Sequence, residues 1–148
     1  MSGTIHTHID QFIATVTFSH PQSNSFPSEL LQKLIDTFDR LSTDDNVRVI
    51  VLQSEGEKTF CAGASFDELM AINDLESGKA FFSGFANLIN AMRKCSKIII
   101  GRVQGQPTSG CNMAETQRHG EGYNQGRDSH VILRSCYAQF TTVRSLLM

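Results

Sequence analysis

The sequence lacks any apolar run long enough to cross a bilayer, and its first residues lack the features of a secretory leader. A membrane-spanning helix needs about 20 mostly apolar residues in a row, and no stretch of this chain reaches that length. Residues 1–11 combine neither a positively charged start nor an apolar centre, and a signal peptide requires both. These absences predict a cytoplasmic protein without a membrane partner.

Basic residues are not massed anywhere, and the formal net charge is only −2. A protein that binds a polyanion presents concentrated positive charge, so nucleic acid is not expected as a partner. A CxxC pair is also missing, because the four cysteines stand apart at positions 61, 95, 111 and 136. Separated cysteines in a cytosolic protein are most simply reduced, which predicts free thiols.

What the chain contains is the material for one compact α/β domain. It has 148 residues, 40% of them hydrophobic, which suffices for a core. Alternation predicts a half-buried strand over 13–19, and the apolar runs 47–53 and 98–103 are typical of strands covered on both faces. Apolar stripes predict a helix from Pro27 to about 42 and another over about 75–94. This order of strands and helices is that of an α/β fold.

The clearest chemical pattern lies in residues 60–69, which read FCAGASFDEL. Ser65 and Glu68 have the spacing of a capping box, in which a hydroxyl and a carboxylate satisfy the free amides that open a helix. This predicts that Ala64 immediately precedes a helix. Gly63 permits a sharp turn and close approach of a ligand, and the helix dipole favours negative charge there. The segment therefore predicts a backbone oxyanion hole.

This segment, together with the strand-like residues before it, resembles the crotonase family, the enoyl-CoA hydratases and isomerases. The resemblance runs from about Ala14 to Gly105. It implies part of the family's spiral of ββα turns, with an acyl-CoA thioester as substrate and no separate cofactor. The run 61–64 matches the family's first oxyanion motif. By that resemblance, the Ala64 amide donates a hydrogen bond to the thioester oxygen.

The resemblance also implies where coenzyme A lies. Family members hold its adenosine end near the loop after the first long strand and near the oxyanion turn, which here are residues 20–24 and 61–64. A family basic residue aligned near Gln22 is missing, so weaker binding of the phosphates is expected. The coenzyme A contacts carried over from the family are Asn24, Cys61, Ala62, Gly63 and Ala64.

The family's remaining catalytic groups fit the chain poorly. Laid on without gaps, the family's glycine triplet falls on residues 109–111, which makes Gly110 the predicted second oxyanion donor. The first family glutamate falls on Met113, and Glu115 lies two residues away, where a helix turns it to another side. The second glutamate has no counterpart. Because carboxylates move the proton in the family reaction, we expect impaired catalysis.

The character of the chain changes after residue 106. All five lysines precede Pro107, and residues 107–130 show no apolar periodicity. We therefore expect a partial crotonase-like domain over 1–106 and a divergent or out-of-frame tail of little order over 107–148. Short strands fit residues 131–133 and 140–143.

Other candidate sites have simpler interpretations. His6 and His8 would share one face of a strand, but no further ligands are spaced nearby, so surface histidines are expected and no metal site is predicted. Residues 128–130 contain triad residue types as immediate neighbours, which cannot form the relay. The phenylalanines of 81–85 are expected in the core, and Asp67 as a helix-opening acid.

Three functions stay open at this point. The leading interpretation is an enoyl-CoA hydratase or isomerase acting on acyl-CoA. The second is a non-catalytic binder of CoA thioesters or an assembly partner, and the third is a truncated product without function. The resemblance implies homotrimers or hexamers, but the closing helices that build family trimers have no equivalents here.

Overall fold

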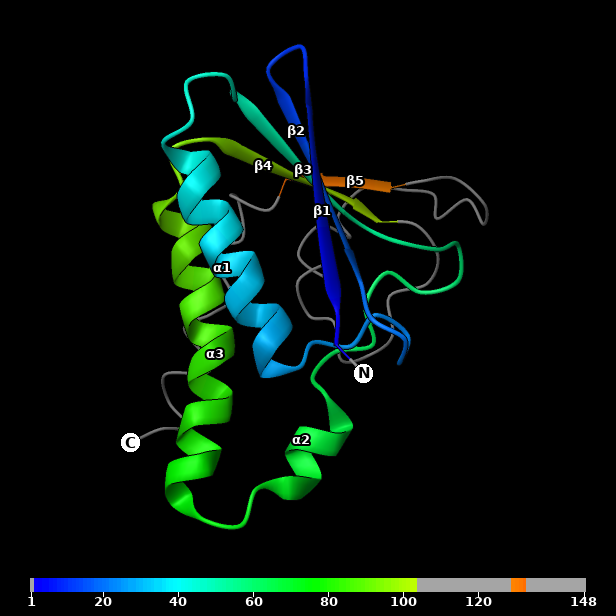
Figure 1. Ribbon diagram of the computed structural model, residues 1–148, viewed down its shortest axis with the longest axis vertical. Helices are drawn as coiled ribbons and strands as arrows, with labels where there is room; N and C mark the ends of the chain where they lie inside the picture. Colours follow the sequence, from blue (N-terminus) through cyan, green and yellow to red (C-terminus); the bar gives the residue numbers. More distant parts are fainter. Residues whose placement is uncertain (1, 104–128, 133–148) are drawn as a thin grey trace, which may run out of the picture.

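A computed structural model describes residues 2–103 and 129–132, which form one mixed sheet with helices packed against it (Figure 1). The strands are β1 (Thr4–Asp10), β2 (Ile13–Ser19), β3 (Val49–Ser54), β4 (Ile98–Val103) and β5 (Ser129–Ile132), and the helices are α1 (Ser28–Ser42), α2 (Phe66–Ala71) and α3 (Leu75–Lys94). The sheet order is β1-β2-β3-β4-β5. Both β2–β3 and β3–β4 are parallel, whereas the two outer pairs are antiparallel. The α/β class predicted from the sequence is confirmed.

The core lies between this sheet and the two longer helices, which pack against one another. Strand β2 buries alternate residues on the helix side, and α1 meets them with an apolar stripe. Burying each such side chain stabilises the fold by about 1.5–3 kcal/mol. The fully buried stripe of α1 consists of Leu30, Leu31, Leu34, Phe38 and Leu41.

Strand β3 is buried on one face and half-buried on the other, so the predicted cover on both faces is partial there, and the second face of β4 is more open. Ile50 and Leu52 are buried, but the alternate residues Val51 and Ile100 are only half-buried. Ile98 is 45% exposed. The apolar composition of β3 fits this partial cover of its second face.

Strand β1 forms an antiparallel hairpin with β2, which the apolar pattern of the sequence did not predict. Its residues alternate, but most are exposed, so the apolar pattern is weak. Gln11 and Phe12 form the two-residue turn with φ of 45° and 65°, a conformation that usually selects asparagine or glycine. Neither residue type marks this turn, which explains why it was missed.

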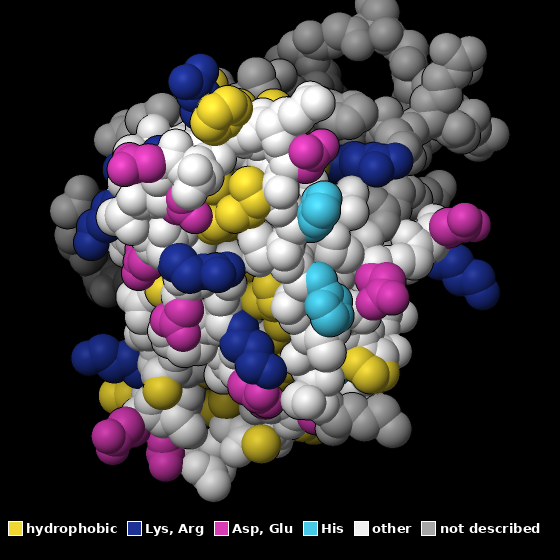
Figure 2. Space-filling view, turned by 45° about the horizontal axis from the view of Figure 1, so that its top comes forward, with side chains coloured by type: hydrophobic (Ala, Val, Ile, Leu, Met, Phe, Trp, Pro, Cys, Tyr) yellow, Lys and Arg dark blue, Asp and Glu magenta, His cyan; other side chains and the backbone are white. Residues whose placement is uncertain are grey.

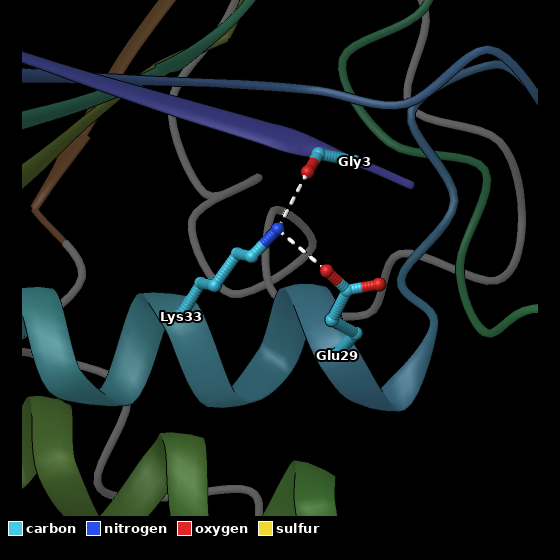
Figure 3. A network of polar contacts seen from close by, with 3 residues as sticks. All are labelled: Gly3, Glu29 and Lys33. Carbon is cyan, nitrogen blue, oxygen red and sulfur yellow. Dashed lines mark hydrogen bonds and ion pairs between the residues drawn. The ribbon is translucent and has the colours of Figure 1, made fainter. Parts of the chain in front are cut away.

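Helix α1 is tied to the start of β1 by Lys33 (Figure 3). The Lys33 ammonium donates to the Gly3 carbonyl at 3.1 Å and pairs with the Glu29 carboxylate at 2.7 Å. The hydrogen bond from Lys33 lowers the pKa of Glu29 below its usual value. The edge strand therefore has a polar attachment to the helix layer as well as its ladder to β2.

Three smaller predictions had different outcomes. Pro27 was expected as the first residue of α1, but it is the N-cap and the helix begins at Ser28. Phe82 is 60% exposed, whereas Phe81 is buried as predicted. Cys61 and Cys95 are buried free thiols, in agreement with the prediction.

Of the helices in the described part of the chain, none is long and apolar enough to span a membrane.

Candidate oxyanion site

The backbone on either side of Ala64 is fixed by a parallel bridge to Phe26. The Phe26 amide donates to the Gly63 carbonyl at 2.8 Å, and the Ser65 amide donates to the Phe26 carbonyl at 3.2 Å. In a bridge of this kind the amide of the central residue points away from the partner strand. Ala64 is exposed, and its amide donates to no acceptor among the described residues. The predicted oxyanion donor is thus held in place and open.

Gly63 supplies the turn that the sequence predicted. Its φ is 91°, in the region that favours glycine, and its amide donates to the Cys61 sulfur at 3.1 Å. Cys61 is itself 1% exposed. The buried Cys61 thiol therefore stabilises the turn by accepting this hydrogen bond. Ala62 is half-buried and Ala64 is exposed.

The capping box expected at Ser65 forms only in part. The Ser65 hydroxyl accepts from the Glu68 amide at 3.4 Å, as predicted. The Glu68 carboxylate, however, does not return to its own helix. It accepts from the Ser28 amide at 2.9 and 3.1 Å and from the Ser28 hydroxyl at 2.6 Å. Glu68 therefore caps the start of α1, whose own N-cap, Pro27, has no side-chain hydrogen bond.

Helix α2 has only six residues, which weakens the expected help from a helix dipole at Ala64. A helix macrodipole grows from aligned peptide units, and one and a half turns supply little of it. Negative charge at Ala64 would therefore be held by the amide itself. Asp67 at the start of α2 accepts a hydrogen bond from the Gln22 side chain at 2.7 Å, so this edge of the site carries a carboxylate.

The loop that carries the predicted adenosine contacts is built around Asn24. Its side chain accepts from the His20 amide at 3.0 Å and donates to the carbonyls of Glu55 and Thr59, both at 2.9 Å. Asn24 is 7% exposed and has φ of 57°. The side-chain amide is thus committed to shaping the loop.

His20 and Ser25 complete this network. The Ser25 hydroxyl contacts His20 Nδ1 at 2.9 Å, and the Gln22 amide donates to the same nitrogen at 3.3 Å. Both residues are buried. This pair was not predicted, because no local pattern marks a serine five positions after a histidine as its hydrogen-bond partner.

The structure brings the two predicted halves of the site together through the Phe26–Ala64 bridge and the Gln22–Asp67 contact. Gly110, the predicted second donor, lies outside the described residues, as do Met113 and Glu115. What the described site can do chemically is to present one oriented backbone donor to an anionic or polarised oxygen.

The sequence is similar to those of known proteins that act on CoA thioesters, by their names. Residues 8–116 match the family described as Enoyl-CoA hydratase/isomerase. The chain is 29% identical over 108 residues to the probable enoyl-CoA hydratase of Bacillus subtilis (strain 168), covering 73% of this chain and 42% of that protein. It is 30% identical over 92 residues to the 6-oxocyclohex-1-ene-1-carbonyl-CoA hydrolase of Geobacter metallireducens, covering 60% and 24% respectively.

Solved structures agree with the sequence matches. An enoyl-CoA hydratase/carnithine racemase from Magnetospirillum magneticum superimposes with a TM-score of 0.63 at 25% identity, over 68% of this chain and 39% of that one. The enoyl-CoA hydratase of Mycobacterium smegmatis gives 0.62 at 28% identity, over 67% and 39%. The chain spans less than half the length of each of these relatives.

Proposed function

Because the chain belongs to the enoyl-CoA hydratase/isomerase family, we propose that it binds an acyl-CoA thioester through the Ala64 amide. The observation that carries this proposal is the Phe26–Ala64 bridge, which orients Ala64 and leaves its N–H without an acceptor among the described residues. The thioester carbonyl oxygen would accept that hydrogen bond. Negative charge gathers on this oxygen when the α carbon becomes an enolate, so the same donor would bind more strongly as the reaction proceeds.

The adenosine end of coenzyme A would lie along residues 20–24. Asn24 contributes by holding the loop, and the backbone of the loop makes the contact. Gln22 is neutral and bonded to the Asp67 carboxylate. A carboxylate near the phosphates would weaken binding, so we expect modest affinity for free coenzyme A.

Hydration of an enoyl thioester adds a hydroxyl at the β carbon and a proton at the α carbon, and a positioned carboxylate ordinarily moves these protons. Met113 stands where the resemblance places the first of them. We propose that this chain binds acyl-CoA with little or no turnover. The first candidate function is an enoyl-CoA hydratase or isomerase of impaired activity, and the second is a non-catalytic binder of CoA thioesters. Measured turnover separates the two.

The binding proposal is tested by Ala64→Pro, which removes the amide hydrogen. Affinity for a non-hydrolysable acyl-CoA analogue is measured by calorimetry. Loss of one neutral hydrogen bond is worth about 0.5–1.5 kcal/mol, or roughly 2- to 12-fold in affinity. Ala64→Gly keeps the donor and is the matched control. Equal affinity of the folded proline variant and the native chain would contradict the assignment.

Turnover is tested separately with a short enoyl-CoA, by following loss of the conjugated thioester. Carboxylate catalysis is typically worth about 10²- to 10⁴-fold. We expect hydration at the background rate while the analogue still binds. Robust turnover that Glu115→Gln abolishes would show instead that a relocated carboxylate serves as base.

A further inference from the structure

We propose that His6 and His8 together chelate a divalent transition-metal ion on the outer face of β1. The two residues are two positions apart on one strand, so their side chains leave the same face of the sheet. Both are exposed. Figure 2 shows histidine side chains near one another at the surface. This site lies away from Ala64, and its argument does not depend on the proposed function.

The sheet register leaves the pair room to converge. His6 lies opposite Thr17 and His8 lies opposite Thr15, and both of these neighbours have short side chains. Positions i and i+2 of a strand are about 6.5–7 Å apart, and imidazole nitrogens bind zinc at about 2.0–2.1 Å. Two rings that lean toward one another from these positions can therefore share one ion.

The orientation of β1 is fixed from its other face. Thr7, between the two histidines, accepts a hydrogen bond at 3.5 Å from Arg40 of α1. Since successive residues of a strand alternate, the imidazoles point away from the helix layer. The outer face of β1 is thus the one that presents both rings to solvent.

Neither imidazole makes a polar contact with residues 2–103. No hydrogen bond or ion pair there involves His6 or His8, whereas His20 is buried and bonded to Ser25. A neutral imidazole without a protein partner keeps one ring nitrogen free to bind a metal. The pair therefore has ligand atoms available without breaking any polar contact within residues 2–103.

The ligand set selects the kind of ion. Imidazole suits zinc, nickel and copper, and among divalent ions copper(II) binds such sites most tightly. In the described part of the chain no three histidine, cysteine or acidic side chains converge on one point. The remaining coordination positions would therefore be filled by water. Asp10, on the same face of β1 and exposed, adds negative charge near the ion.

The test is titration of the tag-free full chain with copper(II) at neutral pH, followed by calorimetry and electron paramagnetic resonance. We expect one tight site with two coordinated nitrogens. His6→Gln and His8→Gln should each weaken it at least about tenfold, because the second ligand of a chelate binds at high effective concentration. His119→Gln and His130→Gln are matched controls and should leave it unchanged.

Circular dichroism checks the fold of each variant, since exchanging an exposed side chain seldom alters stability by more than about 0.5 kcal/mol. Copper affinity that is the same in native chain, His6→Gln and His8→Gln would overturn the proposal. So would a loss of the tight site in either control variant, because the ligands would then lie elsewhere.

Discussion

Removal of the Glu68 carboxylate should destabilise the whole domain, although Glu68 belongs to a six-residue helix. Its oxygens accept the Ser28 amide at 2.9 and 3.1 Å and the Ser28 hydroxyl at 2.6 Å. Loss of an N-cap costs about 0.5–2 kcal/mol, and a hydrogen bond to a charged group is worth about 1.5–3 kcal/mol. Solvent screening reduces the second value because the contact is exposed. We expect Glu68→Ala to lower the free energy of unfolding by about 1–2 kcal/mol.

The assay is reversible thermal or urea unfolding followed by circular dichroism. A loss of this size should lower Tm by about 3–8 °C in a chain of this length. Glu57→Ala is the matched control, because Glu57 is exposed and has no hydrogen bond or ion pair among the described residues. It removes the same charge and should shift stability by no more than about 0.5 kcal/mol.

A double-mutant cycle isolates the contact itself. Ser28→Ala keeps the amide and removes the hydroxyl, so Glu68 and Ser28 should show a coupling energy of about 0.5 kcal/mol or more. Additive effects of the two substitutions, together with a Glu68→Ala loss no larger than that of Glu57→Ala, would refute the role of Glu68 as a cap of α1. That result would mean that α1 begins equally well without a partner from α2.

Four further predictions concern other residues. Asn24→Ala should lower the free energy of unfolding by urea by about 2–4 kcal/mol, because three buried or half-buried backbone groups lose their hydrogen-bond partner. Asn24→Asp keeps the acceptor but not the two donated bonds, so it should not recover native stability. Leu34→Ala should cost about 2–5 kcal/mol by the same assay, as a fully buried leucine of the core; a smaller loss would mean that the helix layer repacks. Gln11→Gly should raise Tm by a few degrees, because it releases about 1 kcal/mol of backbone strain at positive φ. An unchanged Tm would show that the turn is unstrained. The hydrogen bond from the Ser77 amide lowers the pKa of Asp74. The stability gained from this cap is therefore present above the ordinary aspartate pKa and is lost as pH falls through the lowered pKa. The difference in unfolding free energy between the native chain and Asp74→Ala should vanish in acid, and a difference that persists there would contradict the ionic cap.

The sequence predicted those elements whose burial is one-sided and strong. The alternation of 13–19 gave β2 with its bounds, and residues 75–94 and 98–103 became α3 and β4 as expected. Strand β1 was missed because its exposed threonines and histidines dilute the apolar pattern. Strand β5, at residues 129–132, overlaps the short strand expected at 131–133. The crotonase-like fold class is confirmed by the matched structures.

At the site, local chemistry was readable and distant contacts were not. Gly63 and the Ser65 cap follow from residues within a few positions of each other, and both were predicted. The Glu68 contact with Ser28 joins residues 40 positions apart, and no local pattern distinguishes it from the capping box that the spacing suggested. The same holds for the Asn24 bonds to residues 55 and 59. Carboxylate and amide side chains have several satisfactory partners, and the tertiary fold decides among them.

The bridge between Phe26 and Ala64 also has a kinetic consequence. It closes a long loop, so the entropy of bringing its ends together must be overcome before the bridge contributes any enthalpy. Contacts of this kind tend to form after the local helices and slow the approach to the native state. A thioester docked on Ala64 would therefore bind only after most of the domain had folded, and its main effect on the chain would be to slow unfolding.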